Sequence, residues 1–304
     1  MRLTREQVHH RWDRSLAPAL QAASGDEVEL ETVDASGGQI RAQSTAADLA
    51  ALSLDRVNPV TGPVLVAGAQ PGDALVVEVL EIETEGWGWT ANIPGFGLLC
   101  DEFPDPALAI SAITADSVTL PFGVTLAAVP MIGTLGVALP EPGEHPILPP
   151  SRHGGNMDIR HLTAGATVRL PVGVPGALLS LGDVHAAMGD GEVCGTGIET
   201  AARVRLRLGL EKGAAPAFPL LETSGASDRR GPALAATGIG PDLMQAAREA
   251  VLGLLEVLER RHRMARLDAY LLASVAADLK ICELVDAPNW VVSAHLEQRL
   301  LSAL

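Results

Sequence analysis

Apolar and polar positions alternate in short runs from about residue 24 to residue 210, and Gly or Pro interrupts the runs. Alternation with a period of two places successive side chains on opposite faces of a β-strand. Frequent Gly and Pro between such runs are typical of the turns in an all-β sandwich or barrel assembly. The pattern therefore predicts a β-rich region that contains little helix.

Three segments of this region share a form in which a small polar turn precedes a run of strand-forming residues. They are SGDEVELET from residue 24, PGDALVVEV from residue 71 and AGATVRLPV from residue 164. Gly supplies the backbone freedom that a turn needs, and the Asp in two of the segments can accept hydrogen bonds from nearby amides. We predict a turn followed by a strand at each of these positions.

The pattern changes after Pro241, where apolar residues recur three and four positions apart. Residues 242–261 (DLMQAAREAVLGLLEVLERR) lack interior Pro, and their spacing predicts an amphipathic helix. Residues 266–285 keep the same period and predict a second helix, largely buried against the β region, that ends before Pro288. The loop 211–231 is rich in Gly, Ala, Pro and Ser, so we expect a mobile connection or lid there.

Together these patterns predict a mainly β protein with α+β elements, built from β-sandwich or barrel-like lobes plus two C-terminal helices. We expect residues 1–210 to form the β-rich lobe, and residues 211–304 to form a loop and helical part packed on the same core. A chain of 304 residues can bury a substantial core. Its content is 47% hydrophobic but only 3% aromatic, so aliphatic side chains must fill that core.

The chain is acidic, with a formal net charge of -15. Nucleic acids and anionic membranes are bound mainly through clustered Lys and Arg, so we expect neither as a partner. The N-terminal residues show no secretory signal, and no apolar run approaches the roughly 20 residues of a membrane span. We therefore expect a cytoplasmic protein. Its cysteines, Cys100, Cys194 and Cys282, are odd in number and widely spaced, which argues against a disulfide framework.

Side chains suited to catalysis or metal binding concentrate in two stretches. SRHGGNMDIRH supplies His153, Asn156, Asp158 and His161, and SLGDVHAAMGDGEVCGTGIE supplies Asp183, His185, Asp190, Glu192 and Glu199. Strand-like alternation in GDVH places Asp183 and His185 on one face, where a carboxylate and an imidazole can point at the same cation. The many glycines allow short, tightly turned loops, so we predict a pocket with two walls.

Each of these residues also has a structural interpretation. An Asp in a Gly-rich loop commonly forms an Asx-turn, and this applies to Asp158, Asp183 and Asp190. His153 and His161 can be ordinary hydrogen-bonded histidines, and we assign His161 a structural role. The functional interpretation therefore depends on how many polar and charged side chains these two stretches bring together, and not on any one of them.

Mechanisms based on a lysine base or a serine elbow fit the chain poorly. Its only lysines, Lys212 and Lys280, lie in a loop and a predicted helix with no Ser-rich Gly motif nearby. Ser180 has no GxSxG motif around it. Cys194, two residues after Glu192, leaves a thiolate route open.

Several ordered motifs resemble the acetamidase/formamidase family nearly end to end. They are HHRWD from residue 9, DASGGQI from 34, RVNPVTGPVLVAGAQPGDALVVEVLEI from 56, PGFGLL from 94, GGNMD from 154, LPVGVPGALLSLGDVHAAMGDGEVCGTGIE from 170 and AYLLASVAADLKI from 269. The resemblance implies a β-rich architecture, homo-oligomeric assembly, hydrolysis of short-chain amides to carboxylate and ammonia, and a divalent metal site.

The family's motifs carry over residue by residue. Its GGNxD pattern falls on Asn156 and Asp158, and its GDxHxxxGDGE pattern falls on Asp183, His185, Asp190 and Glu192. Met188 stands where the resemblance leads us to expect Gln. A thioether cannot donate a hydrogen bond as an amide can, so contact with substrate at this position would favour a larger or more apolar amide.

The resulting hypothesis is metal-assisted amide hydrolysis. Zinc or a similar ion, held by Asp158, Asp183 and His185, would lower the pKa of a water molecule and polarise the amide carbonyl. Glu192 would accept the proton of that water and return it to the departing nitrogen. The oxyanion would be stabilised by Asn156 or by glycine amides of the GDGE turn. His153 would orient a metal ligand without binding the metal itself.

Two alternatives remain open. Carboxylate-rich loops suit calcium, so the chain could be a β-rich ligand-binding protein with a structural calcium ion. Asp190 and Glu199 are the candidates for such a second, oxygen-lined site. The other alternative is a relative that acts on a larger amide or an imide.

Overall fold

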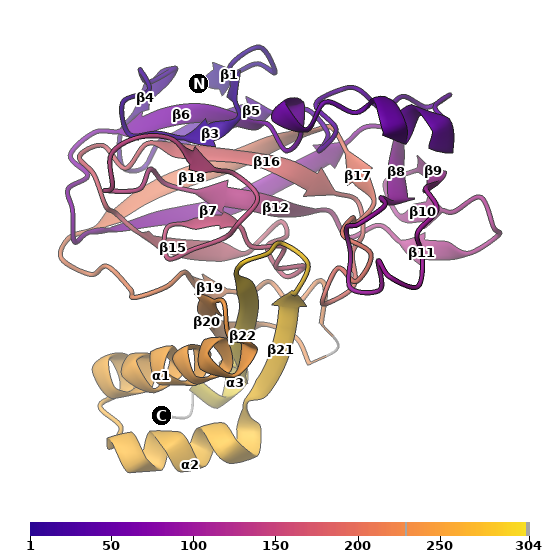
Figure 1. The fold of residues 1–304 in the computed structure, drawn as a ribbon. Helices are drawn as coiled ribbons and strands as arrows, with labels where there is room; N and C mark the ends of the chain where they lie inside the picture. The colour runs from indigo at the N-terminus through magenta and orange to yellow at the C-terminus, as the bar shows by residue number, and fades with distance from the viewer. Residues whose placement is uncertain (229, 302–304) are drawn as a thin grey trace.

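The computed structural model describes residues 1–228 and 230–301. Strands make up most of its main body, and α-helices gather in the C-terminal part of the chain, coloured orange to yellow in Figure 1. The prediction of a mainly β fold with C-terminal helices is therefore confirmed. Among the described residues the sheets pack as a sandwich, and neither of the large sheets closes into a barrel.

The first large sheet spans the molecule from the N-terminal strand to the C-terminal strands. Its order is β1 (Arg2–Leu3), β5 (Glu27–Glu31), β18 (Ala202–Glu211), β7 (Ala74–Thr84), β15 (Thr167–Pro171), β19 (Leu220–Glu222), β20 (Ala233–Gly240), β22 (Trp290–Glu297) and β21 (Asp278–Glu283). The turn-and-strand segments predicted at residues 24, 71 and 164 are confirmed, because they contain β5, the first part of β7, and β15.

The second large sheet carries the strands nearest the candidate site. Its main order is β11 (Thr125–Ala127), β10 (Ser117–Thr119), β9 (Ala107–Ile113), β8 (Trp87–Asn92), β17 (Glu199–Thr200), β16 (Leu179–His185), β12 (Met131–Gly136) and β14 (Gly154–Asn156). Strand β6 (Val60–Val66) pairs with β16 and also with β2 (Val8–His9) and β4 (Leu20–Ala22). A small separate sheet joins β3 (Arg11–Trp12) to β13 (His145–Pro146).

Alternation along β18 shows why these segments form a sandwich. Its inward residues Val204, Leu206 and Leu208 are buried, whereas the arginines between them face solvent. Arg205 lies 3.2 Å from Glu81 of the neighbouring strand β7. Cross-strand ion pairs thus line the outer face, while apolar side chains line the inner face.

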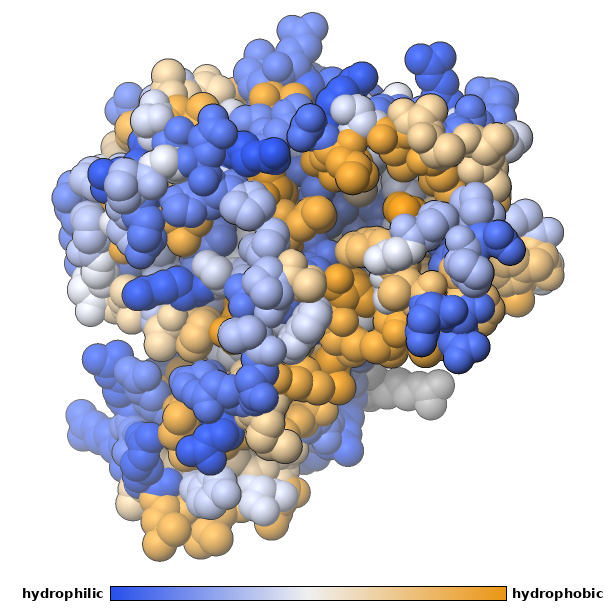
Figure 2. All heavy atoms as spheres, in the orientation of Figure 1, coloured by the Kyte–Doolittle hydropathy of each residue, from blue (hydrophilic) through white to orange (hydrophobic). Residues whose placement is uncertain are grey.

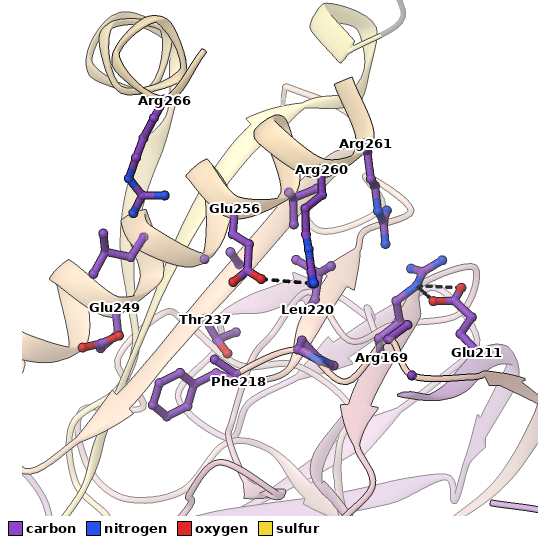
Figure 3. Close-up of a pocket in the computed structure, with 18 residues that line it drawn as sticks. Arg169, Glu211, Phe218, Leu220, Thr237, Glu249, Glu256, Arg260, Arg261 and Arg266 are labelled. Atoms are coloured by element: carbon purple, nitrogen blue, oxygen red, sulfur yellow. Dashed lines mark hydrogen bonds and ion pairs between the residues drawn. The ribbon is translucent and has the colours of Figure 1, made fainter. Parts of the chain in front are cut away.

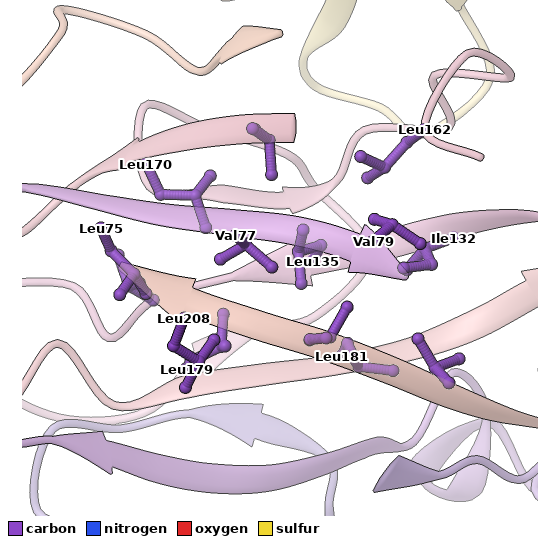
Figure 4. Packing of buried hydrophobic residues seen from close by; sticks show 14 of the residues in the cluster. Leu75, Val77, Val79, Ile132, Leu135, Leu162, Leu170, Leu179, Leu181 and Leu208 are labelled. Carbon is purple, nitrogen blue, oxygen red and sulfur yellow. The ribbon is translucent and has the colours of Figure 1, made fainter. Parts of the chain in front are cut away.

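The main core lies between the two large sheets. Figure 4 shows Leu75, Val77 and Val79 of β7 facing Leu135 of β12 and Leu181 of β16. These side chains are fully buried. Because the inward residues are Leu, Val and Ile, the expectation of an aliphatic core is confirmed.

The helices cover the far end of the first sheet. Helix α1 (Leu243–His262) packs on β20 and β22, and α2 (Arg266–Ala276) and the short α3 (Gln298–Leu301) extend that layer. Short 3-10 segments, η1 (Ala46–Ala51) and η2 (Leu54–Arg56), lie in the N-terminal part. Figure 2 shows apolar residues gathered across the middle of one face, and polar residues over most of its periphery.

The prediction for α1 is confirmed, but the second predicted helix is wrong over its last part. Its predicted burial is wrong as well, because only Ala269 and Ala273 of α2 are buried and most of its larger apolar side chains face outward. Helix α2 ends at Ala276, and the residues that follow form β21 rather than helix. Residues Asp278 to Glu283 pair with β22 and become the edge of the sheet. Tertiary strand pairing overrides local helix preference here, because an alternation such as DLKIC fits either period over so few residues.

The first large sheet contains strands from both of the parts that we expected, residues 1–210 and residues 211–304. Strand β15 pairs with β19, which lies beyond the expected boundary at residue 210. The division at 210 and 211 stays a prediction. Within residues 1–228 and 230–301, no helix is long and apolar enough to cross a membrane.

Candidate active site

Strand register brings the two predicted stretches together. His185 ends β16 and lies beside Glu199 of β17 on one side, and beside Met131 of β12 on the other. On the far side of β12, Asn156 at the end of β14 pairs with Thr134. Strands β14 and β16, which end at Asn156 and His185, are therefore separated only by β12. This confirms that the two predicted stretches meet in space.

Gly133 of β12 explains how Asp158 and Asp183 converge. A Cβ built on Gly133 would lie 2.5 Å from Asp158 Oδ1 and 2.7 Å from Asp183 Oδ2, so both carboxylates occupy the space that a side chain would fill. Asp158 and Asp183 both have left-handed backbone conformations, with φ of 45° and 55°. Non-glycine residues seldom adopt this conformation, and functional sites are where it concentrates.

His185 lies at the centre of a buried group of carboxylates. Its Nε2 is 3.2 Å from Asp183 Oδ1 and 3.2 Å from Glu199 Oε2. Glu192 Oε1 lies 3.9 Å from the same nitrogen, and Asp158 Oδ1 lies 4.0 Å from it. All five residues are at least 93% buried. We refer to Asp158, Asp183, His185, Glu192 and Glu199 as the carboxylate cluster.

The cluster carries more negative charge than its one imidazole can balance. Burial raises the pKa of Asp158 and of Glu192 well above their usual values, and the neighbouring carboxylates add to the effect. Burial also raises the pKa of Glu199 to about 7. Burial alone would lower the pKa of His185, but Glu199 and Asp183 outweigh it and raise this pKa well above its usual value. A bound cation would relieve this excess of negative charge.

The donor atoms fit a divalent cation. Ligand atoms of Asp158, His185 and Glu192 lie within 4.8 Å of one another, and those of Asp183, His185 and Glu199 meet the same limit. Both carboxylate oxygens of Asp158 are buried and accept no hydrogen bond from the described residues. Buried carboxylates without donors are commonly metal ligands, and imidazole with carboxylate is a zinc donor set.

Asn156 lies beside the cluster in a network of polar side chains. Its Oδ1 accepts hydrogen bonds from Asn58 Nδ2 at 2.9 Å and from Thr134 Oγ1. Its Nδ2 donates to Asp286 Oδ2 at 2.6 Å. Burial raises the pKa of Asp286 well above its usual value, and Glu283 and Asp183 add to this. The predicted oxyanion role of Asn156 is not tested by these contacts.

Sequence reasoning missed Asp286, Asn58, Thr134 and Gly133. Asp286 follows the segment that was wrongly predicted as helix, so its approach to Asn156 could not be foreseen. Thr134 lies in a buried strand and resembles an ordinary core residue. Asn58 alone carried a local signal, because Asn in the RVNP turn tolerates the left-handed φ of 47° that it adopts.

His153 lies against Trp12, with ring centroids 5.0 Å apart in an edge-to-face arrangement. Ser151 Oγ lies 2.7 Å from its Nδ1. Burial lowers the pKa of His153 to about 3, so the imidazole is neutral. Among the described residues no hydrogen bond or ion pair joins His153 to the carboxylate cluster. Its predicted role, which is to orient a metal ligand without binding the metal, stays a prediction.

A second group of histidines lies outside the cluster. His161, His295 and Asp228 are close enough to share an ion, but Lys280 Nζ pairs with Asp228 and lies 3.3 Å from His161 Nε2. The lysine ammonium thus already supplies a cation. Asp190 lies 3.5 Å from Arg160 and 3.8 Å from His161 rather than beside Glu199. The predicted calcium site of Asp190 and Glu199 gains no support from this placement.

The lysines that other amidase mechanisms would need are engaged elsewhere. Lys212 pairs with Asp73 at 2.6 Å, and Lys280 pairs with Asp228. Cys194 Sγ lies 3.6 Å from the carbonyl oxygen of Thr196, and Cys194 faces the same cavity as Glu192.

Two cavities lie next to residues of the site. One, of about 520 Å³, is lined by Met188, Glu192, Cys194 and apolar residues such as Leu126. The other, of about 590 Å³, is lined by Asp286 together with apolar side chains. These volumes are ample for a small ligand and its water.

A third hollow lies apart from the site. Figure 3 shows it between α1 and the end of the first sheet, with Arg260 bonded to Glu256 and Arg169 bonded to Glu211. The Arg260–Glu256 pair measures 3.0 Å. Since its charges are paired and none of the carboxylate cluster lines it, we do not place the chemistry there.

The fold and the site thus define a β-sandwich protein in which a buried imidazole and carboxylates, a set of side chains that could hold a metal ion, lie beside a cavity. Comparison with known proteins gives the particular family. The Acetamidase/Formamidase family model matches residues 1–145 and 143–301, so the chain belongs to this family. The resemblance found in the motifs is thereby confirmed.

Individual relatives agree with this assignment. A formamidase from Methylophilus methylotrophus is 27% identical, over 93% of this chain and 86% of its own length. The crystal structure of an acetamidase from Bacillus halodurans superposes with a TM-score of 0.92 at 33% identity, covering 100% of this chain and 99% of that one. A gamma lactamase from Delftia acidovorans has a TM-score of 0.70 at 28% identity, covering 96% and 89%.

Proposed function

We propose that this protein uses a divalent metal ion, zinc in the first instance, to hydrolyse a short-chain aliphatic amide to a carboxylate and ammonia. Family membership supports an amidohydrolase that acts on linear amides. The observation that carries the metal dependence is Asp158, whose buried carboxylate accepts no hydrogen bond from the described residues and converges with Asp183 and His185.

In this proposal Asp158, Asp183 and His185 hold the ion. Both carboxylates lie in the space over Gly133, and His185 Nε2 lies 4.0 Å from Asp158 Oδ1 and 3.2 Å from Asp183 Oδ1. When bound, the ion would supply a Lewis acid that polarises the amide carbonyl and makes water more acidic. The remaining steps fall to the side chains of the protein.

Glu192 is the proposed proton carrier. It faces the 520 Å³ cavity and lies 3.9 Å from His185 Nε2. Its carboxylate takes one proton from the attacking water while the new carbon–oxygen bond forms. The same proton passes to nitrogen as the carbon–nitrogen bond breaks, so that ammonia leaves and the acyl group becomes a carboxylic acid. This acid then releases its remaining proton at neutral pH and becomes a carboxylate. Burial raises the pKa of Glu192, which suits a group that must both accept and return a proton near neutral pH.

Asn156 and the glycine amides of the GDGE turn are proposed to stabilise the oxyanion. One hydrogen of Asn156 Nδ2 is used by Asp286, which holds the amide plane in place. The second hydrogen is available to an oxygen that develops negative charge.

The first test is ammonia release from formamide, acetamide, longer aliphatic amides and aryl amides, with and without a chelator. We expect turnover of at least one amide, loss of turnover after chelation, and recovery when zinc is added. Calcium restoring the fold without turnover would favour the structural-ion alternative. No ammonia from any amide would contradict the proposed activity.

Glu192→Gln separates the proposed base from a metal ligand. We expect this variant to keep its zinc content and to lose about 10²–10⁴-fold in kcat, the usual range for removing a general base. Asp55→Asn is the matched control, because Asp55 is 93% exposed and pairs with Arg11 rather than with a member of the cluster. Loss of both zinc and turnover in Glu192→Gln would instead make Glu192 a ligand.

A larger or cyclic amide is the second candidate substrate. The cavity beside Glu192 is wider than formamide requires, and Met188 and Leu126 give it apolar walls. One structural relative is described as a gamma lactamase. The panel of amides distinguishes the two candidates. A kcat/KM that rises with the size of the acyl group would favour the larger amide, and one that falls would favour the short-chain amide.

We also infer that the protein works in the cytoplasm, and that it is a homo-oligomer, as the family resemblance implies. Light scattering at several protein concentrations measures the mass of the assembly. A mass of one chain at all concentrations would contradict this inference.

A further inference from the structure

We propose that Met188 is a positioning residue for His185, and that its thioether accepts a hydrogen bond from His185 Nδ1 and thereby keeps Nε2 directed at the metal position. The inference rests on the proposed function, because it concerns how tightly the cluster holds its ion. Its consequence concerns this chain in particular: the one imidazole of the cluster has a weak hydrogen-bond acceptor, a thioether, next to its Nδ1.

The geometry of the ring carries the proposal. Met188 Sδ lies 3.3 Å from His185 Nδ1, and it is the hydrogen-bond partner found for that nitrogen among the described residues. The opposite nitrogen, Nε2, faces Asp183 and Glu199, each at 3.2 Å. A donor bond from Nδ1–H to sulfur therefore fixes which nitrogen offers its lone pair to a cation.

The local chain explains why Met188 reaches this place. His185 ends β16, and the chain turns at once, so that the side chain three residues later folds back onto the ring. Gly197 also packs close to the ring, since a Cβ there would lie only 2.6 Å from Nδ1. The Gly197 backbone and the Met188 thioether thus both lie near Nδ1, which leaves the ring little room to rotate.

The chemical character of sulfur sets the direction of the effect. A thioether is a weak hydrogen-bond acceptor, whereas an amide or carboxylate oxygen is a strong one. Strong acceptors behind a metal-bound histidine orient the ring and raise its basicity, and losing them costs about 10–100-fold in metal affinity. We therefore infer that zinc affinity depends on residue 188, and that Gln there would hold zinc at least as tightly as Met.

Met188 also lines the cavity next to Glu192, so a second role must be separated from the first. If Met188 acts only on substrate, its replacement changes KM and leaves zinc affinity untouched. If it acts through His185, zinc affinity changes before any substrate is added. Metal affinity is therefore the deciding measurement.

The experiment compares Met188→Leu and Met188→Gln with the wild-type protein. Zinc affinity is measured by competition with a chelating dye on the full-length protein, without substrate. We expect Met188→Leu, which keeps the volume but removes the acceptor, to bind zinc about tenfold more weakly. We expect Met188→Gln to bind at least as tightly as the wild type, because its amide oxygen accepts the same hydrogen bond.

Leu126→Ala is the control. Leu126 lines the same cavity, and none of its hydrogen bonds reaches His185. We expect it to change KM and to leave zinc affinity unchanged. Thermal unfolding of each metal-free variant identifies any loss of zinc that comes from misfolding.

The outcomes are distinct. Unchanged zinc affinity in Met188→Leu, or equal weakening in the Leu and Gln variants, would overturn the role of the hydrogen bond while leaving the proposed function intact. A wild-type protein that binds no zinc would overturn the proposed function itself. Weakening in Met188→Leu with affinity kept in Met188→Gln would support the inference.

Discussion

At the scale of single residues, an absent side chain defines the site as much as the side chains that are present. Gly133 leaves open the space into which Asp158 and Asp183 both project. Its backbone carbonyl also accepts the amide of Asp158 at 3.2 Å, which holds that residue in its left-handed conformation. The cluster therefore requires glycine at this point of β12.

We predict that Gly133→Ala removes metal binding and turnover. The new Cβ would displace both carboxylates, since it would lie 2.7 Å or less from each, and real Cβ contacts are not that short. We expect zinc affinity, measured by dye competition, to fall by at least about tenfold. The circular dichroism spectrum should remain that of a β-rich protein.

Gly240→Ala is the matched control, because a Cβ at Gly240 would meet nothing within 4 Å. Gly240 lies at the end of β20 and away from the cluster. Full zinc affinity in Gly133→Ala would show that the two carboxylates do not act together at this position.

At the scale of elements, the boundary between α2 and β21 matters most for the site. Had the helix continued to residue 285, Glu283 and Asp286 would face other surroundings. Instead β21 ends at Glu283, whose Oε1 accepts the backbone N–H groups of Val285 and, at 2.5 Å, of Asp286. This turn places Asp286 within 2.6 Å of Asn156.

Glu283 gives this turn a measurable dependence on pH. Burial raises its pKa from 4.5 to about 7, so the folded protein binds the proton more tightly than the unfolded chain does. The stability that Glu283 contributes is therefore full below about pH 4.5 and is lost as pH rises through 7. The shift corresponds to an effect on the order of 3 kcal/mol.

We predict that Glu283→Gln flattens the change of stability between pH 5 and pH 8. The amide oxygen can still accept both backbone N–H groups, but it carries no charge to bury. Urea unfolding across this range measures the effect. A variant less stable than the wild type at pH 8 would contradict this account of the turn.

At the scale of the whole molecule, the cluster lies where segments from distant parts of the chain meet. Strand β12 separates β14 from β16, and β21 and its turn approach from the C-terminal part. An ion held there would join these parts only in the folded state. Metal binding should then stabilise the entire fold, since a ligand that binds only the native state shifts the unfolding equilibrium.

We predict that zinc raises the thermal midpoint of the wild-type protein by several degrees. At a free concentration of 100 times the Kd, such a ligand adds about 2.7 kcal/mol. Asp183→Asn should show a much smaller rise, because it removes one of the converging carboxylates. Scanning calorimetry with and without chelator measures both. A midpoint that is unaffected by zinc in the wild type would argue against a metal at this site.

The sequence alone was sufficient for features that depend on local order. Turn residues before alternating runs predicted β5, β7 and β15, and apolar spacing predicted α1. The two motifs that supply Asp158, Asp183, His185 and Glu192 were recognisable in the same way, and their resemblance to the motifs of one family grouped these residues. Each turn, helix or single motif is encoded within a short stretch of neighbouring residues.

Tertiary structure decided the rest. It made residues 278–283 an edge strand, because pairing with β22 outweighed helical spacing. It also brought Asp286 to Asn156 and left Gly133 beneath two carboxylates. Sequence could not foresee such contacts, because burial and register between distant strands create them and no short stretch of chain encodes either.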